Sequence, residues 1–403
     1  MASCVESHNR AEHPDGEAGG PSLVYTRKLI PLSPETRREV DPETGEVRTL
    51  HQVKGEWIDL PDHRKLRAER WALKASAHRL LPADHRTTKC HRWRVPKQEI
   101  QVLRGGDHGR AFYKGLQVCA SVWCCPVCAS KISERRRVEL VGAVATAKAM
   151  DLKVYLLTLT VPHGLGDDVK VMLAGMAKAW AKMNQGRPGV ENRQRVGLVG
   201  TVRALEVTHG ANGFHPHFHA LLFLDTDLAP DQVQAAFSPL WQKVAVRSGL
   251  PMPSDLHGCR VDDGEKAAAY VSKGAGWGLE SELTKGHLKR GKKGSRTPWD
   301  LLRDCSEGDR KAGALFSVYA DAFHGRRQLY WSNGLKKRLA VQDCTDEEIA
   351  HQEDEQAAQL LARITEPQWK AVRSLHFESV VLDLAESSPE GLRQFLESLP
   401  CPD

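Results

Sequence analysis

The pattern of apolar and polar positions separates an unpatterned N-terminal segment from a regularly patterned remainder. Residues 1–60 are rich in Gly, Pro, Ser, Glu and Arg and keep no sustained period, so we expect them to be largely disordered. Residues 61–80 follow a helical period. Residues 132–150 form a long amphipathic run, which predicts a helix opened by the basic triplet Arg135-Arg136-Arg137.

Apolar, β-branched segments further along the chain predict a sheet. The predicted strands cover residues 152–161, 198–208, 214–224 and about 258–261. The dipeptide Asn212-Gly213 favours a tight hairpin between two of them, because both residues tolerate positive φ. The predicted helices cover residues 167–182, 231–247 and about 264–272. This order predicts an α+β fold in which helices pack on one face of an antiparallel sheet.

Composition narrows the class of protein. With 403 residues, of which 41% are hydrophobic and 27% charged, the chain is not disordered throughout, a collagen or a coiled-coil rod. No run approaches the ~18 apolar residues of a membrane helix, and residues 1–17 lack the apolar stretch of a signal peptide. We therefore expect a cytoplasmic protein with no membrane partner.

The net charge of +6 conceals an uneven distribution. Residues 345–403 hold 13 Asp and Glu against 4 Lys and Arg, so this segment carries −9 and the rest of the chain +15. A basic body with an acidic end favours a polyanionic partner for the body.

Four of the ten cysteines lie within ten residues, which points to a metal because a reducing cytoplasm disfavours disulfides. Cys125 and Cys128 form a Cys-x-x-Cys pair, which supplies two zinc ligands from one turn. Cys119 and Cys90 complete a set of four, and Cys124 is able to substitute. Four thiolates leave no open coordination position, so we expect structural Zn²⁺. The alternative is a set of buried free thiols or a redox pair.

Three histidines alternate along the predicted strand 214–224, at positions 215, 217 and 219. The period of two places them on one face, and His217 with His219 can chelate a divalent ion. Glu206, on the preceding strand, can reach the same ion across the hairpin. The alternative is a surface row of histidines beside a solvated glutamate.

A tyrosine lies on the predicted helix 264–272. Lys273 is ~60° around the helix from Tyr270, whereas Glu265 is ~140° away. A tyrosine hydroxyl beside an ammonium group and a metal has the parts for nucleophilic attack on a phosphodiester. Core packing of the ring is the alternative.

Taken together, these motifs resemble a known family. LTLT at residues 157–160, ALEVTHGANGFHPHFHALLF at 204–223 and AAAYVSKG at 267–274 resemble the three ordered motifs of HUH endonucleases. More narrowly, they are similar to the rolling-circle replication initiator (Rep) proteins of bacterial plasmids. Residues 119–137 and 325–337 also look like plasmid Rep sequences, so the resemblance covers roughly residues 90–337.

The resemblance implies a metal-dependent, site-specific nickase and strand transferase for single-stranded DNA. His217, His219 and Glu206 would hold Mg²⁺ or Mn²⁺ while Tyr270, aided by Lys273, attacks the scissile phosphate. The products would be a 5′-phosphotyrosine and a 3′-OH primer. The implied partners are a single-stranded or hairpin replication origin and a host helicase and polymerase.

One position departs from the family pattern. Related single-tyrosine initiators place a glutamate four residues before the tyrosine to activate water for the terminating cleavage, and here that position is Lys266. Glu265 is one residue out of phase. Asp263, seven residues before Tyr270 and ~20° out of phase, is the candidate replacement. The base for termination stays open between these two carboxylates.

Several basic residues are candidate phosphate contacts. The glycine-rich run 285–296 holds six Lys and Arg and no acid, which suits a loop over a phosphate backbone, although a solvated charged loop is the alternative. The predicted DNA contacts are Arg135, Arg136, Lys289, Arg290, Lys292, Lys293, Arg326 and Arg327. Trp93, Trp123, Trp277 and Trp299 flank basic or cysteine-bearing segments and are candidates for stacking on unpaired bases.

The sequence predicts four parts of the chain and leaves two alternative functions open. The parts are a largely disordered segment (1–60), a zinc-binding module with a basic helix (61–150), an HUH endonuclease domain (151–340) and an acidic, helical C-terminal region (341–403). One rival is an HUH transposase or relaxase of a mobile element, although relaxases usually place the tyrosine before the histidines. The other is a non-catalytic, zinc-containing DNA-binding regulator.

Overall fold

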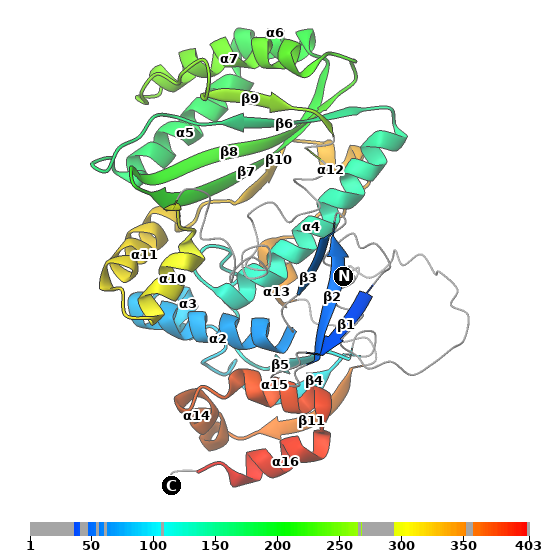
Figure 1. The fold of residues 1–403 in the computed structure, drawn as a ribbon, viewed down its shortest axis with the longest axis vertical. Helices are drawn as coiled ribbons and strands as arrows, with labels where there is room; N and C mark the ends of the chain where they lie inside the picture. The colour runs from blue at the N-terminus through cyan, green and yellow to red at the C-terminus, as the bar shows by residue number, and fades with distance from the viewer. Residues whose placement is uncertain are drawn as a thin grey trace. The chain divides into compact units, whose positions relative to one another are not determined.

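The computed structural model describes residues 36–40, 47–53, 56–59, 63–105, 109–264, 267, 294–351 and 358–400. The chain forms two compact units, coloured along the sequence in Figure 1. The first unit draws on residues 1–78, 82–121 and 344–403, and the second on residues 79–81 and 122–343. The four-part division expected from the sequence stays a prediction. No helix in the described ranges is long and apolar enough to cross a membrane.

The second unit is built on an antiparallel sheet with the strand order β10-β7-β8-β6-β9. Its strands are β6 (Lys153–Leu159), β7 (Leu198–Gly210), β8 (Gly213–Leu224), β9 (Cys259–Asp262) and β10 (Leu329–Trp331). The β7–β8 hairpin turns at Ala211 and Asn212, and Gly213 follows with a φ of +88°. The positive φ favours glycine there, and the space is also tight, because a Cβ would lie 3.2 Å from the Gly164 carbonyl oxygen.

Helices cover both faces of this sheet. The helices of the second unit are α4 (Pro126–Ala149), α5 (Val169–Asn184), α6 (Gly186–Arg195), α7 (Pro230–Val246), α10 (Pro298–Ser306), α11 (Arg310–Phe323) and α12 (Leu335–Arg338). On one face, the Trp180 ring of α5 packs edge-on against Phe218 of β8. The predicted α+β class with an antiparallel sheet is confirmed, and α4 and α12 add a partial cover on the second face.

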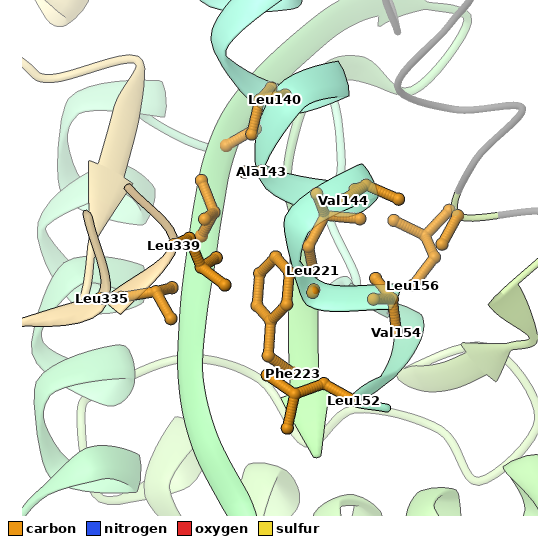
Figure 2. Close-up of a cluster of buried hydrophobic side chains, with 14 residues drawn as sticks. Leu140, Ala143, Val144, Leu152, Val154, Leu156, Leu221, Phe223, Leu335 and Leu339 are labelled. Atoms are coloured by element: carbon orange, nitrogen blue, oxygen red, sulfur yellow. The ribbon is translucent and has the colours of Figure 1, made fainter. Parts of the chain in front are cut away.

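Figure 2 shows the core beneath that second cover. Ala143 and Val144 of α4 meet Leu221 and Phe223 of β8, and Leu335 of α12 closes the side. Helix α4 begins earlier than expected, at residue 126 instead of 132, because Pro126 occupies its first turn, where a missing N–H costs nothing. The apolar end of this face packs against α4, and its other end carries the histidines.

The first unit contains a second sheet, with the order β11-β4-β5. Its strands are β4 (Ile100–Arg104), β5 (Ala111–Lys114) and β11 (Gln359–Ile364), and its helices are α2 (His63–Leu80), α3 (Arg86–Lys89), α13 (Asp346–His351), α14 (Glu366–Ser374), α15 (Glu378–Ser387) and α16 (Pro389–Ser398). Strand β11 pairs antiparallel with β4, so the C-terminal region contributes a strand as well as the expected helices.

Acidic residues of the C-terminal region have partners within the first unit. Arg67 of α2 forms ion pairs with Asp383 and Glu386 of α15, and all three side chains are at most 25% exposed. The Tyr113 hydroxyl donates a hydrogen bond to the Glu378 carbonyl oxygen. Part of the negative charge of residues 345–403 is therefore neutralised by Arg67 within the first unit.

Three further strands lie near the N-terminus. Strands β1 (Thr36–Val40), β2 (Val47–Val53) and β3 (Glu56–Asp59) form an antiparallel sheet in the order β1-β2-β3. The prediction of little order in residues 1–60 therefore does not hold for these strands. They are only 4 to 7 residues long. Runs this short leave the average composition of the segment polar and hide the alternation of each strand.

Candidate metal centres and active site

Two residues of β8 and one of β7 form the first candidate metal centre. In the antiparallel register Glu206 lies opposite His217, and Ala204 lies opposite His219. Glu206 Oε2 is 3.5 Å from His217 Nε2 and 3.8 Å from His219 Nε2. The three side chains are 13–18% exposed, so they line a surface that a ligand can reach.

The other ring nitrogens of the two histidines have backbone or hydroxyl partners. His217 Nδ1 lies 3.2 Å from the His215 carbonyl oxygen, to which it can only donate, so in the neutral ring Nε2 carries the lone pair. His219 Nδ1 lies 2.9 Å from the Thr158 hydroxyl oxygen on the neighbouring strand β6. Such second contacts fix the ring orientation of metal-binding histidines.

Electrostatics favour a cation at this position. Burial lowers the pKa of His219 to about 4, so this ring is neutral at pH 7 and in the form that binds metal. Burial also acts to lower the pKa of His217, but the hydrogen bond and the charge of Glu206 outweigh it and raise the pKa overall. Two imidazoles and a carboxylate therefore form a group that can hold a divalent ion.

An arginine extends the same row across the sheet. Arg260 of β9 pairs with Thr158, which in turn pairs with His219, so the three residues lie side by side on one face. The Arg260 side chain is 60% exposed, and its Nη2 lies 2.8 Å from Asp262 Oδ1. Thr158, Arg260 and Asp262 were not predicted as site residues, because the position of β6 between β8 and β9 is set by long-range pairing.

A fourth histidine extends the row in the other direction. His163 Nδ1 lies 3.2 Å from His215 Nδ1, and the ring centroids are 4.5 Å apart. Burial and the neighbouring histidines lower the pKa of His215 to about 4. His163 follows Pro162 just after β6, and the only signal in the sequence was its closeness to the LTLT motif.

The predicted nucleophile lies outside the described residues. Tyr270, Lys273 and Glu265 all fall in that part of the chain, as do Lys289, Arg290, Lys292 and Lys293. Ala267 is the last described residue before Tyr270, and its amide donates to the Asp263 carbonyl oxygen at 2.9 Å. The Asp263 side chain is exposed.

Four cysteines form the second candidate metal centre. The Sγ atoms of Cys90, Cys119, Cys125 and Cys128 lie within 4.8 Å of one another, and all four residues are at most 3% exposed. A zinc ion with Zn–S bonds of about 2.3 Å separates its sulfur ligands by about 3.8 Å, which this arrangement approaches. The structure thus brings together the four predicted cysteines, although no metal identity follows.

The local structure around three of these cysteines favours a negative charge on the sulfur. Cys125 is the N-cap of α4 and Cys128 lies in its first turn, where the positive end of the helix dipole favours a negative charge. Near Cys119 Sγ, the Ser121 amide approaches to 3.5 Å and the Thr87 hydroxyl to 3.7 Å. Cys124 is also buried.

The described basic candidates differ in what they offer to DNA. Arg136 is 9% exposed, and its guanidinium forms a 2.8 Å ion pair with Glu139. Arg135 is more exposed than Arg136 and lies 3.8 Å from the same carboxylate. Arg326 is half-buried, with its Nε donating to the Ala322 carbonyl oxygen, whereas Arg327 is exposed. Arg135 and Arg327 are therefore better placed to meet a phosphate than Arg136 and Arg326.

A comparison with protein families bears on the whole site. The profile of a family described as replication protein matches residues 112–373, which include Cys119, His217, His219 and Tyr270. The chain belongs to the replication protein family. This confirms the resemblance to Rep proteins that the sequence motifs indicated.

Two curated relatives of this replication protein come from Streptomyces. It is 29% identical to Protein rep of Streptomyces lividans over 346 residues, covering 67% of this chain and 76% of the relative. It is also 29% identical over 141 residues to a protein named neomycin resistance protein of Streptomyces cyanogenus, covering 29% of this chain and 32% of the relative. No solved structure matches the chain.

Proposed function

We propose that this replication protein initiates rolling-circle replication of a plasmid by nicking one strand of the replication origin. The observation that carries the proposal is the group of Glu206, His217 and His219, whose ligand atoms all lie within 4.8 Å of one another. Three protein ligands leave positions open for phosphate oxygens, as a catalytic metal site requires. The four-cysteine group leaves none, so we assign it a structural role with Zn²⁺.

The donor set fits a divalent ion with mixed nitrogen and oxygen ligands. Bound there, such an ion would supply positive charge to the scissile phosphate. Mg²⁺ is usually held by oxygen ligands, so the two imidazoles favour Mn²⁺ of the two expected ions. Glu206 contributes the one negative charge among the three ligands.

In this proposal Tyr270 is the nucleophile. Its phenolic oxygen bonds to phosphorus, the bond from phosphorus to the 3′ oxygen breaks, and that oxygen takes up a proton to become the 3′-OH primer. The phenol proton is lost to solvent or to a base, and the Lys273 ammonium stabilises the phenolate. A later 3′-OH reverses the step and transfers the strand.

The described residues before Tyr270 support this assignment. Ala267 is fully buried in the apolar cluster that contains Leu156 and Leu221. In β8, Leu221 has the same parity as His217 and His219, so the cluster and the two histidines share one face of the sheet. Ala267, three residues before Tyr270, therefore packs on the face that carries the candidate metal centre.

The deciding experiment detects a covalent DNA adduct. Purified protein is mixed with Mn²⁺ and single-stranded oligonucleotides from the parent replicon, labelled on the 3′ side of the cleavage point. We expect a denaturation-resistant adduct on the 5′ end of the downstream fragment. Tyr270→Phe should lose the adduct and keep DNA binding, because it removes one oxygen and no phosphate contact. An adduct that persists in Tyr270→Phe would exclude this tyrosine as the nucleophile.

The same experiment separates the rival functions. A non-catalytic DNA-binding regulator would bind the origin and give neither a nick nor an adduct under any divalent ion. A transposase or relaxase would form an adduct, but at the end of a mobile element or at a transfer origin. Mapping the nick on the parent replicon decides between these outcomes.

A further inference from the structure

Trp93 presents its ring to solvent, unlike most of the described tryptophans. It is 59% exposed, whereas Trp241 and Trp369 are fully buried. Trp123 and Trp299, which the sequence offered for stacking on bases, are 7% and 5% exposed and belong to the core. An exposed indole of this kind loses contact with water only when a partner covers it.

The backbone around Trp93 is held in place. The Gln117 amide donates to the Trp93 carbonyl oxygen at 2.8 Å, and the Val95 amide donates to the Gly115 carbonyl oxygen at 2.8 Å. Cys90, three residues earlier, is fully buried within the four-cysteine group. The ring therefore projects from a fixed platform, which lowers the entropy cost of covering it.

Basic residues flank Trp93 in the sequence. Residues 85–98 contain no acidic residue, and their five Lys and Arg side chains are exposed. We call these cations and the ring the Trp93 surface; its members are Arg86, Lys89, Arg92, Trp93, Arg94 and Lys97. Arg94 pairs with Glu366 at 2.7 Å and Arg86 with Glu347 at 3.6 Å, both in exposed pairs that a polyanion can replace at little cost.

Arg373 places a further positive charge near Arg92 of this surface. The positive charge of Arg92 acts on Arg373 of α14, whose pKa is lowered by burial and by that neighbour. Arg373 Nε is buried and has no hydrogen-bond partner within the described part of the chain. An anion near Arg92 would relieve this repulsion.

We infer that the Trp93 surface binds single-stranded DNA, with an unpaired base stacked on the Trp93 ring and the phosphates held by the surrounding cations. Base faces are available for stacking only where DNA is unpaired, and cations beside an aromatic ring are typical of such surfaces. This surface belongs to the first unit and shares no residue with the Glu206, His217 and His219 group of the second unit. The inference rests on the proposed function only for the choice of DNA as the polyanion.

The test measures binding without cleavage. Full-length, zinc-loaded protein is titrated against a fluorescent single-stranded 12-mer in the absence of added divalent ion, and anisotropy gives Kd. We expect Trp93→Ala to weaken binding about 5- to 150-fold and Trp93→Phe to retain most of the affinity. Lys97→Ala should reduce the slope of log Kd against log salt by about 0.7. Leu256→Ala and Lys178→Ala, which alter exposed residues elsewhere, serve as matched controls.

An abasic oligonucleotide of the same length isolates the stacking. Wild-type protein should bind it as weakly as Trp93→Ala binds the normal strand, and Trp93→Ala should bind both strands equally. An equal loss of abasic and normal binding in Trp93→Ala would overturn the inference, because the residue would then act without a base. Equal affinity of the wild type for polyglutamate and for the 12-mer would also overturn it, in favour of an acidic protein partner. Since no nick is measured, neither result depends on the fate of the proposed nickase activity.

Discussion

The Thr158 hydroxyl oxygen lies 2.9 Å from Nδ1 of His219, so a residue of β6 orients a ring of β8 whose Nε2 faces Glu206. The contact crosses a strand pair in which Thr158 and His219 are direct partners. It connects the candidate metal centre to the neighbouring strand β6, and it is the kind of outer contact that tunes metal affinity.

We predict that Thr158→Val weakens Mn²⁺ binding at this centre about 10- to 100-fold, the usual cost of losing such a partner. Valine keeps the shape and the strand propensity, so the melting temperature should change little. Thr158→Ser should retain the affinity. Thr160→Val removes a hydroxyl that donates to the His257 carbonyl oxygen and serves as the control. Calorimetric titration checks this, and unchanged affinity in Thr158→Val would show that the hydroxyl does not orient His219.

Metal binding should depend on pH through His217. Its pKa is raised above the ordinary 6.5, so below that pKa an ion must displace a proton, and affinity falls about tenfold per pH unit. Above the pKa of His217 affinity should be level. His219, with a pKa of about 4, adds no dependence near neutral pH. Titrations between pH 5.5 and 8.5 measure the curve.

Glu206→Gln tests whether Glu206 causes this pH dependence of metal affinity. It removes the charge that raises the pKa of His217 and leaves burial, which lowers it. The inflection should therefore move to lower pH, while the affinity at pH 8 falls because a ligand charge is lost. An inflection that stays in place would assign the titration to another group.

The cysteine centre should behave as a structural site. We expect about one zinc per chain in freshly purified protein and its loss in Cys125→Ser or Cys128→Ser, with a melting temperature lower by roughly 5–10 °C. Cys124→Ser should keep the metal, because its sulfur is not part of the group of four. Elemental analysis and thermal unfolding measure both effects, and protein that holds no zinc would refute the assignment.

The final hydrolysis of the phosphotyrosine tests whether Asp263 or Glu265 activates the attacking water. If the helix that Ala267 enters continues regularly to Tyr270, Glu265 points ~140° away from the nucleophile and Asp263 only ~20° away. Asp263→Ala should then slow hydrolytic release of the phosphotyrosine, and Glu265→Ala should leave it nearly unchanged. Adduct turnover on a suicide oligonucleotide measures both variants. A defect confined to Glu265→Ala would mean that the helical phase is different.

The candidate metal centre was predictable from sequence because its geometry is local. The period of two along β8 put His217 and His219 on one face, and Asn212-Gly213 fixed the hairpin register that places Glu206 opposite His217. Cys125 and Cys128 were equally local, being one turn apart at the start of α4.

Features that depend on long-range pairing could not be predicted. The insertion of β6 between β8 and β9 brings Thr158 beside His219 and Arg260 beside Thr158, and nothing in the neighbouring sequence specifies that order. Strand β11 was missed because its partner β4 is remote and its six residues lie in an acidic, helix-rich region. Exposure of Trp93 and burial of Trp123 also followed only from packing, since both lie beside cysteines in the sequence.

The pairing of β4 with β11 constrains how the protein folds during its synthesis. Arg104 and Gln359, which face each other across this pair, are 255 positions apart in the sequence. At typical translation rates of ~5–20 residues per second, β4 waits roughly 13 to 50 s for its partner. During that interval one edge of β4 exposes unpaired backbone groups that invite aggregation. The second unit, formed by an uninterrupted run from residue 122 to 343 apart from three earlier residues, can complete its sheet first.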